Sequence, residues 1–318
     1  MGMAAQPETR EEEGPPMTAL ASRPPATGSR PRTGPRLAVP MVVTLLAAAG
    51  VVLTYRFFVG TSLGQLVDTA AMRGADVAHS RVVAVLDRAL NGTTLASLVL
   101  ACLAAAAIGV LRRRVDVAAG AALLVVGANL TTQLLKTRLG RPNLDDFPAP
   151  NSFPSGHTTA AASVAFALIL ALPHAVRGMV TLIGAAYVAV IAVATVWAEW
   201  HRPSDTVAAL LVVLAWGGLV ATVLRAGWWR RTLPGRPTRL TTLLLTVVAM
   251  ITAVASLVGL AAVALSQHVT ADPVAGRFAF LAGAAGITAA VAGCFLIWVR
   301  LAAGGPSART DAAPPAVR

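Results

Sequence analysis

Long runs of apolar residues, separated by short polar segments, dominate the sequence. Eight of these runs approach the ~20 residues that an α-helix needs to cross a lipid bilayer. Because backbone N–H and C=O groups in lipid are hydrogen-bonded within their own segment, we expect each run to form a helix. The pattern therefore predicts an all-α polytopic membrane protein. The runs cover residues 38–59, 94–111, 116–135, 157–173, 179–199, 205–224, 240–265 and 277–300, of which the second and the fourth are the shortest.

The composition agrees with a membrane protein and argues against one that binds nucleic acid. Of the 318 residues, 56% are hydrophobic and 13% are charged, and the mean hydropathy is +0.70. A soluble domain of this length needs more charged surface. The net charge is +12. If the N-terminus is cytoplasmic, most of the 26 basic residues fall in cytoplasmic segments, which is the positive-inside pattern. No pattern of interleaved aromatic and basic residues supports nucleic-acid binding.

Composition also divides the chain into parts. The first residues are rich in Pro, Arg, Glu and Ala without periodicity, which predicts a disordered tail rather than a cleaved signal peptide. The outer segment 60–93 is expected either to form helices on the membrane surface or to cap a site, and both alternatives remain open. We expect a disordered cytoplasmic tail at 1–36, a six-span core at 37–224, a basic cytoplasmic linker with two extra spans at 225–302, and a second disordered tail at 303–318.

Two polar loops hold most of the reactive side chains, and the span count places both on the same membrane face. The first is "KTRLGRPNLDDFPAPNSFPSGH", and the second is "WAEWHRPSD". Lys136 is the only lysine of the protein, a compact point charge suited to a phosphate oxygen. Arg138 and Arg141 follow, and their guanidinium groups can bind phosphate in a bidentate manner. The alternatives are a lysine that extends to the membrane interface and two solvated loop arginines.

The stretch "FPSGHTT" has the features of a helix start that binds an anion. Pro154 and Gly156 favour a turn, and Ser155 is placed to cap the helix that begins near His157. The first turn of a helix has unpaired N–H groups and the positive end of the dipole, which together attract a phosphate. A histidine there can donate a proton to a leaving oxygen. The alternative is a capped helix with an incidental histidine.

The stretch "HRPSD" places Asp205 four residues after His201. In a helix these two side chains share a face. An aspartate bonded to one ring nitrogen fixes the tautomer and makes the other nitrogen a better nucleophile or base. The alternative is that Ser204 or Asp205 only caps the helix that follows Pro203.

His157, His201 and Asp205 are also candidate ligands of a metal ion. No pair of ligands has the HxxxH or HExxH spacing of a zinc site. We therefore expect no catalytic metal and no cofactor.

Taken together, these motifs resemble the type 2 phosphatidic acid phosphatase superfamily, also called the lipid phosphate phosphatase and vanadium haloperoxidase superfamily. Its pattern is K-x6-R-P, then P-S-G-H, then S-R-x5-H-x3-D. "PSGH" is complete here, "HRPSD" supplies H-x3-D, and Lys136 matches the first lysine, so the resemblance covers about residues 37–224.

The sequence departs from this pattern at two places. Asn143 and Leu144 stand where the first motif has Arg-Pro, although Arg141 matches an earlier Arg-Pro of many members. In the third motif, the arginine position is occupied by Thr195. Arg202 and Arg138 are the candidates to replace the missing arginine.

The resemblance implies a double displacement without a metal. His201 would attack phosphorus and form a phosphohistidine, Asp205 would orient His201, and His157 would protonate the leaving oxygen. The phosphate oxygens would be held by Lys136, Arg141, Ser155 and the amide of Gly156.

The position of the motifs also suggests a class of substrate. A site at the outer membrane face suits a lipid phosphate, and the candidates are phosphatidate, phosphatidylglycerol phosphate, a polyprenyl diphosphate such as undecaprenyl diphosphate, and a polyprenyl-phosphate sugar phosphate. The Ala and Arg bias is typical of a high-GC bacterium, so we expect a plasma-membrane protein whose site faces outward. Two rivals remain: a non-catalytic protein that binds or transports phospholipid through a decayed site, and a phosphatase for a small soluble ester. The oligomeric state stays open.

Overall fold

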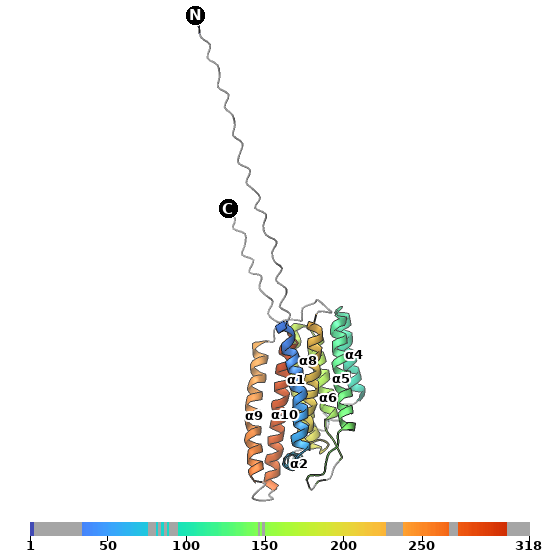
Figure 1. Cartoon of the computed structure of the whole chain (residues 1–318), viewed down its shortest axis with the longest axis vertical. Coiled ribbons are helices and arrows are strands. Elements are labelled where there is room, and N and C mark those ends of the chain that lie inside the picture. The colour runs from blue at the N-terminus through green and yellow to red at the C-terminus, as the bar shows by residue number, and fades with distance from the viewer. Residues whose placement is uncertain are drawn as a thin grey trace. The chain divides into compact units, whose positions relative to one another are not determined.

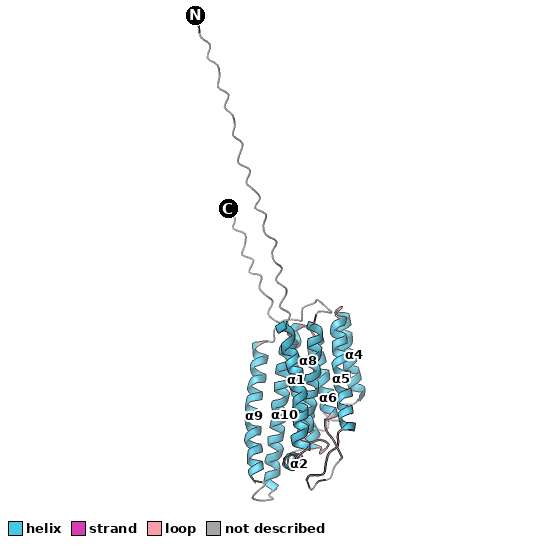
Figure 2. Cartoon of the chain, viewed as in Figure 1, coloured by secondary structure: helices cyan, strands magenta, loops and turns pink. Residues whose placement is uncertain are grey.

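The computed structural model describes residues 1–2, 34–75, 81, 84–85, 88, 95–145, 147, 150–226, 238–266 and 273–303. Within these residues the chain is helical and no strand is found (Figure 2). Figure 1 shows the long helices side by side. In chain order they are α1 (Gly34–Thr54), the π-helix η1 (Tyr55–Val59), α2 (Ser62–Arg73), α4 (Leu95–Leu111), α5 (Val115–Arg138), α6 (Gly156–Ala171), α7 (His174–Trp197), α8 (Pro203–Arg225), α9 (Arg239–Ser266) and α10 (Pro273–Leu301).

Six helices of the described chain are long and apolar enough to cross a membrane. They are α1 with η1, α5, α7, α8, α9 and α10. Helices α4 and α6 are apolar as well but shorter, as expected of the two shortest runs. Large apolar side chains such as Leu46 and Leu257 are more than 60% exposed on α1 and α9, which suits contact with lipid. The all-α polytopic membrane fold is therefore confirmed.

Several boundaries differ from the prediction. Helix α1 begins at Gly34, so residues 34–36 of the predicted tail are helical. Helix α7 begins at His174, five residues before the predicted run, because hydropathy does not register its polar first turn. Most of the two predicted tails and most of the linker after α8 lie outside the described residues.

Helix α6 is at the centre of the bundle, packed against α4, α5, α7 and α8. Its small residues are buried on almost every side, which lets neighbouring helices approach closely. Polar contacts join it to α5, where Thr132 and Thr159 are hydrogen-bonded at 2.9 Å. The predicted extra pair of spans is part of the same bundle, because Trp298 of α10 stacks on Phe166 of α6 at 5.0 Å. The first turn of α6 is thus held on a rigid support.

Candidate functional site

The two polar loops meet at one end of the bundle, as the span count predicts. The backbone N–H of Ser155, just before α6, donates to the backbone oxygen of Asp205 in the first turn of α8 at 2.9 Å. From the loop after α5, Nη2 of Arg141 lies 3.1 Å from Oδ1 of Asp205. Asn151 fastens this loop to the end of α5 by donating to the backbone oxygens of Leu139 and Lys136. Three helix ends and two loops therefore converge on Asp205.

Asp205 is fully buried and its carboxylate is surrounded by donors. Oδ1 receives the bond from Arg141, and Oδ2 receives Oγ of Ser152 at 2.5 Å and the backbone N–H of Arg202 at 3.0 Å. The last bond means that Asp205 caps α8, as the alternative for "HRPSD" predicts. The pairing with His201 is a contact of 3.4 Å, in which Nδ1 has no hydrogen-bond partner among the described residues. A buried carboxylate with several donors stays charged and fixed in orientation.

His201 lies against this carboxylate. Its Nδ1 is 3.4 Å from Oδ2 of Asp205, and its side chain is only 7% exposed. The backbone holds the ring in place, because the N–H groups of Trp200 and His201 both donate to the backbone oxygen of Thr195. Glu199 in the same turn has a φ of 57°, in the left-handed region. With Nδ1 directed at Asp205, Nε2 is the nitrogen left for chemistry.

The start of α6 has the predicted cap. Ser155 is buried, and its Oγ accepts the backbone N–H of Thr158 at 3.4 Å. The N–H groups of Gly156 and His157 have no hydrogen-bond acceptor within the described chain. A Cβ placed on Gly156 would meet only Nε2 of Gln133, at 3.9 Å, so the space beside this amide is open. Open amides at a helix start form an anion site.

His157 is half-buried at this helix start and faces the second loop. Its ring centroid is 5.5 Å from that of Trp200, and it interacts electrostatically with His201 and Lys136. Lys136 in the last turn of α5 is half-buried and interacts electrostatically with Asp205. The fold thus brings the histidines, the aspartate and the lysine together from three separate helices.

The arginines named from sequence differ in their surroundings. The side chain of Arg141 is 3% exposed, and its Nε and Nη1 have no hydrogen-bond partner in the described chain. Arg202 is also buried, with Nε donating to Thr69 at 3.0 Å and Nη2 unpartnered among the described residues. Burial lowers the pKa of the Arg202 guanidinium, and an arginine still remains protonated. Arg138 is exposed at the end of α5.

Helix α2 contributes residues that the sequence reasoning did not name. Gln65 donates to the backbone oxygen of Pro142, Asp68 accepts from Ser204, and Thr69 donates to Asp145 at 2.6 Å. The spacing of Gln65, Asp68 and Thr69 by three and four residues puts them on one helical face, a signal visible in the sequence. The structure therefore favours the capping alternative for the described start of the segment 60–93.

The described residues contain no cluster of three or more His, Cys, Asp or Glu arranged to hold a metal ion. The expectation of a metal-free reaction stays a prediction.

The comparisons with known proteins concern this same region. Residues 117–229 match the model of the PAP2 superfamily. No curated protein and no solved structure was found to match the chain. The matched region includes both polar loops and nearly all of α5 to α8, whose ends form the site. The match over residues 117–229 supports membership of the type 2 phosphatidic acid phosphatase (PAP2) superfamily.

Proposed function

We propose that the protein is a metal-independent histidine phosphatase that hydrolyses a lipid phosphate or a polyprenyl (di)phosphate at the outer membrane face. The match of residues 117–229 to the PAP2 superfamily and the six apolar helices of the described chain support a membrane phosphatase in general. The more specific proposal rests on one observation: the buried His201–Asp205 pair lies beside buried donors that have no acceptor in the described chain.

Those donors define an anion site. Leaving a buried donor without a partner costs about 1–3 kcal/mol, so such donors are retained where a ligand supplies the acceptor. Here the buried donors are Nε and Nη1 of Arg141. The half-buried amides at the start of α6 and the half-buried Lys136 add to them. Their charge and geometry suit the oxygens of a phosphoryl group, whose negative charge grows in the transition state. A phosphate ester is the ligand that these groups fit best.

In the first step, Nε2 of His201 attacks phosphorus and the bond to the leaving oxygen breaks. His157 gives its proton to that oxygen, which makes it a better leaving group. The phosphorylated imidazolium keeps Nδ1–H directed at Asp205, whose negative charge stabilises it.

In the second step, His157 takes a proton from water as the water oxygen attacks phosphorus. The bond between phosphorus and Nε2 breaks, inorganic phosphate leaves, and His201 is neutral again. Division of the reaction into two displacements lowers the barrier of each.

Arg141 is the proposed replacement for the arginine that the third motif lacks. Thr195 brings no cation to the site, since its side chain is buried and donates to the backbone oxygen of Ala192 on its own helix. Arg141 reaches Asp205 and keeps two donors open, so one guanidinium can orient the base and bind the substrate. Arg202, with one open donor, is a secondary candidate, while the exposed Arg138 has less support.

A lipid substrate follows from the position of the site. The exposed apolar side chains of α1 and α9 suit contact with lipid along the helices, and the catalytic loops lie at their ends. Polar loops at the ends of membrane helices lie at headgroup level, where the phosphate of an amphiphile is found. An outward-facing site in a bacterial plasma membrane is part of this proposal.

The second candidate is a non-catalytic phospholipid-binding or transport protein. It is favoured by the loss of cations at Asn143 and Thr195. The intact pairing of His201 with Asp205 argues for catalysis, because binding alone does not require an oriented nucleophile.

Phosphate release tests the proposal. The purified full-length protein is assayed in detergent with EDTA against long-chain lipid phosphates, polyprenyl diphosphate and a short-chain soluble ester. Wild type is compared with His201→Ala and with His174→Ala, an exposed histidine at the start of α7. We expect release from a long-chain substrate that His201→Ala abolishes and His174→Ala preserves. No release by folded protein would favour the binding reading, and equal rates on the soluble ester would refute the lipid preference.

A further inference from the structure

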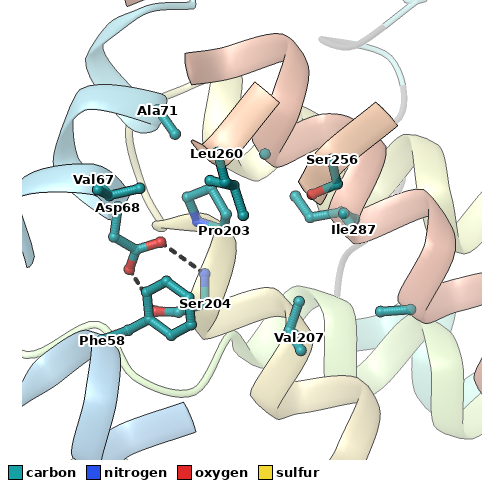
Figure 3. A pocket seen from close by; sticks show the side chains of 13 residues that line it. Phe58, Val67, Asp68, Ala71, Pro203, Ser204, Val207, Ser256, Leu260 and Ile287 are labelled. Atoms are coloured by element: carbon teal, nitrogen blue, oxygen red, sulfur yellow. Dashed lines mark hydrogen bonds between the residues drawn. The ribbon is translucent and has the colours of Figure 1, made fainter. Parts of the chain in front are cut away.

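Helix α2 is hydrogen-bonded to the catalytic segment at Ser204, which lies between His201 and Asp205. The backbone N–H of Ser204 donates to Oδ1 of Asp68 at 3.0 Å, and its hydroxyl donates to Oδ2 of the same carboxylate. Figure 3 shows both bonds, with Asp68 reaching from α2 to the first turn of α8. Two bonds to one residue fix the distance and the rotation of that turn relative to α2.

The carboxylate also supplies an acceptor that α8 lacks. The first N–H groups of a helix have no acceptor within that helix, and Pro203, the first residue of α8, has no N–H group. Ser204 is the next residue, so Asp68 caps α8 from another helix while Asp205 caps it from within. One residue along α2, Thr69 accepts from Nε of Arg202 at 3.0 Å. The residues on both sides of Pro203 are therefore held by α2.

We propose that Asp68 is a positioning residue that sets the reactive geometry of His201 and Asp205 through Ser204. The inference rests on the proposed phosphatase function and extends it to a helix outside the matched region 117–229. Asp68 does not touch the reacting atoms in this account. Its influence passes through the first turn of α8.

The surroundings of Asp68 make its charge sensitive to pH. A cavity of about 140 Å³ lies beside it, lined mostly by apolar side chains of α2, α8, α9 and α10 such as Val67, Leu260 and Ile287 (Figure 3). Burial, reinforced by the charge of Asp205, raises the pKa of Asp68 from 3.8 to about 7. The bonds from Ser204 and the charge of Arg141 oppose that rise without cancelling it.

Among the described residues, the charged groups that interact with Asp68 lie at the site end of the bundle. Asp205 is on α8, Arg202 immediately precedes α8, and Arg141 lies on the loop after α5. From α9 and α10, the described residues that line the cavity are apolar apart from Ser256, and none is titratable. Asp68 therefore contacts the catalytic segment through Ser204 on one side and borders an apolar cavity on the other.

Three variants separate positioning from a purely structural role. Asp68→Asn can accept from the Ser204 N–H and donate to the Ser204 hydroxyl oxygen, and Asp68→Ala can do neither. Leu66→Ala changes an exposed residue of the same helix and is the control. We expect Asp68→Ala to lower kcat about 10- to 100-fold with KM changed less than about threefold, since the defect is in the geometry of the nucleophile. Asp68→Asn should retain most of kcat, and Leu66→Ala should match wild type.

The comparison of Asp68→Asn with Asp68→Ala gives the sharper result. A residue that only stabilises the fold would change the amount of folded enzyme and leave the kcat of the folded enzyme in place. An unchanged kcat per folded enzyme in Asp68→Ala, or an equal loss of kcat in Asp68→Asn and Asp68→Ala, would overturn the proposal.

A measurement without turnover separates this inference from the phosphatase activity. The ¹⁵N signals of the His201 imidazole, assigned by comparison with His201→Ala, are recorded in detergent at one pH in wild type, Asp68→Asn and Asp68→Ala. Signals that move in Asp68→Ala and stay close to wild type in Asp68→Asn support the positioning role even if no substrate is hydrolysed, in which case only the proposed function fails. Unchanged signals in Asp68→Ala refute the positioning role even if the enzyme is active.

Discussion

Replacement of Arg141 by glutamine should damage function far more than stability. The change removes the partner of Oδ1 of Asp205, and a hydrogen bond to a charged group contributes about 1.5–3 kcal/mol. It also removes the two buried donors of Arg141 that have no partner in the described chain, and each such group costs about 1–3 kcal/mol. The two effects oppose each other, and Asp205 keeps its bonds from Ser152 and Arg202. We therefore expect Arg141→Gln to lower the unfolding free energy by no more than about 1 kcal/mol.

The effect of Arg141→Gln on kcat has no compensating contribution. Loss of one donor to the developing charge typically lowers kcat about 10²–10³-fold. The assay combines phosphate release with thermal unfolding in detergent, with and without inorganic vanadate as a phosphate analogue. A ligand at 100 times its Kd stabilises a protein by ~2.7 kcal/mol, so vanadate should raise the Tm of wild type and not of Arg141→Gln.

Arg138→Gln is the matched control, because Arg138 lies three residues before Arg141, at the end of α5, and is exposed. It should keep the activity of wild type within about threefold and the full vanadate effect on Tm. Strong destabilisation of Arg141→Gln together with unchanged stabilisation by vanadate would show that Arg141 is structural, and the anion-site argument would be wrong.

Four further predictions concern the rest of the site. His157→Asn should slow release of an alkyl leaving group about 10²–10⁴-fold and of p-nitrophenol much less, as steady-state rates on the two esters would show. Ser155→Ala should lower the unfolding free energy by about 1 kcal/mol through loss of the α6 cap, measured by thermal unfolding. EDTA should leave the phosphatase rate unchanged; inhibition that a metal ion reverses would contradict this. Because the pKa of Asp68 rises from 3.8 to about 7 on folding, ionisation of Asp68 disfavours the folded state, and this penalty grows between about pH 4 and about pH 7. The stability of wild type relative to Asp68→Asn should therefore fall as pH rises from about 4 to about 7 and be constant above, which melts across this pH range would test.

The parts of the site that sequence predicts are those encoded locally. His201 and Asp205 are four residues apart and do lie together, but His201 precedes α8 and Arg202 at its N-cap is extended, so the contact comes from the capping turn and not from a shared helical face. The Ser155 cap is likewise a local signal that the structure bears out. The membrane helices follow from composition, because lipid leaves no other way to satisfy their backbone groups.

The remaining parts depend on tertiary packing. Sequence offers Arg138, Arg141 and Arg202 as equivalent guanidinium groups, and only the fold shows that Arg141 is buried against Asp205 while Arg138 is exposed. Asp68 lies 136 residues from Ser204 in the chain, so no short-range pattern joins the two. The start of α7 at His174 was missed for a different reason, since polar first turns do not contribute to a hydropathy signal.

The central claim is a covalent phosphohistidine at His201, and trapping it is the most direct test. Purified enzyme is mixed with a lipid phosphate labelled at phosphorus, then denatured rapidly in alkali, in which phosphohistidine survives. Mass spectrometry locates the label. We predict phosphate on His201, stable to base and labile to acid, and none on His201→Ala. Phosphate release by wild type without any covalent label, or release that persists in His201→Ala, would contradict the mechanism.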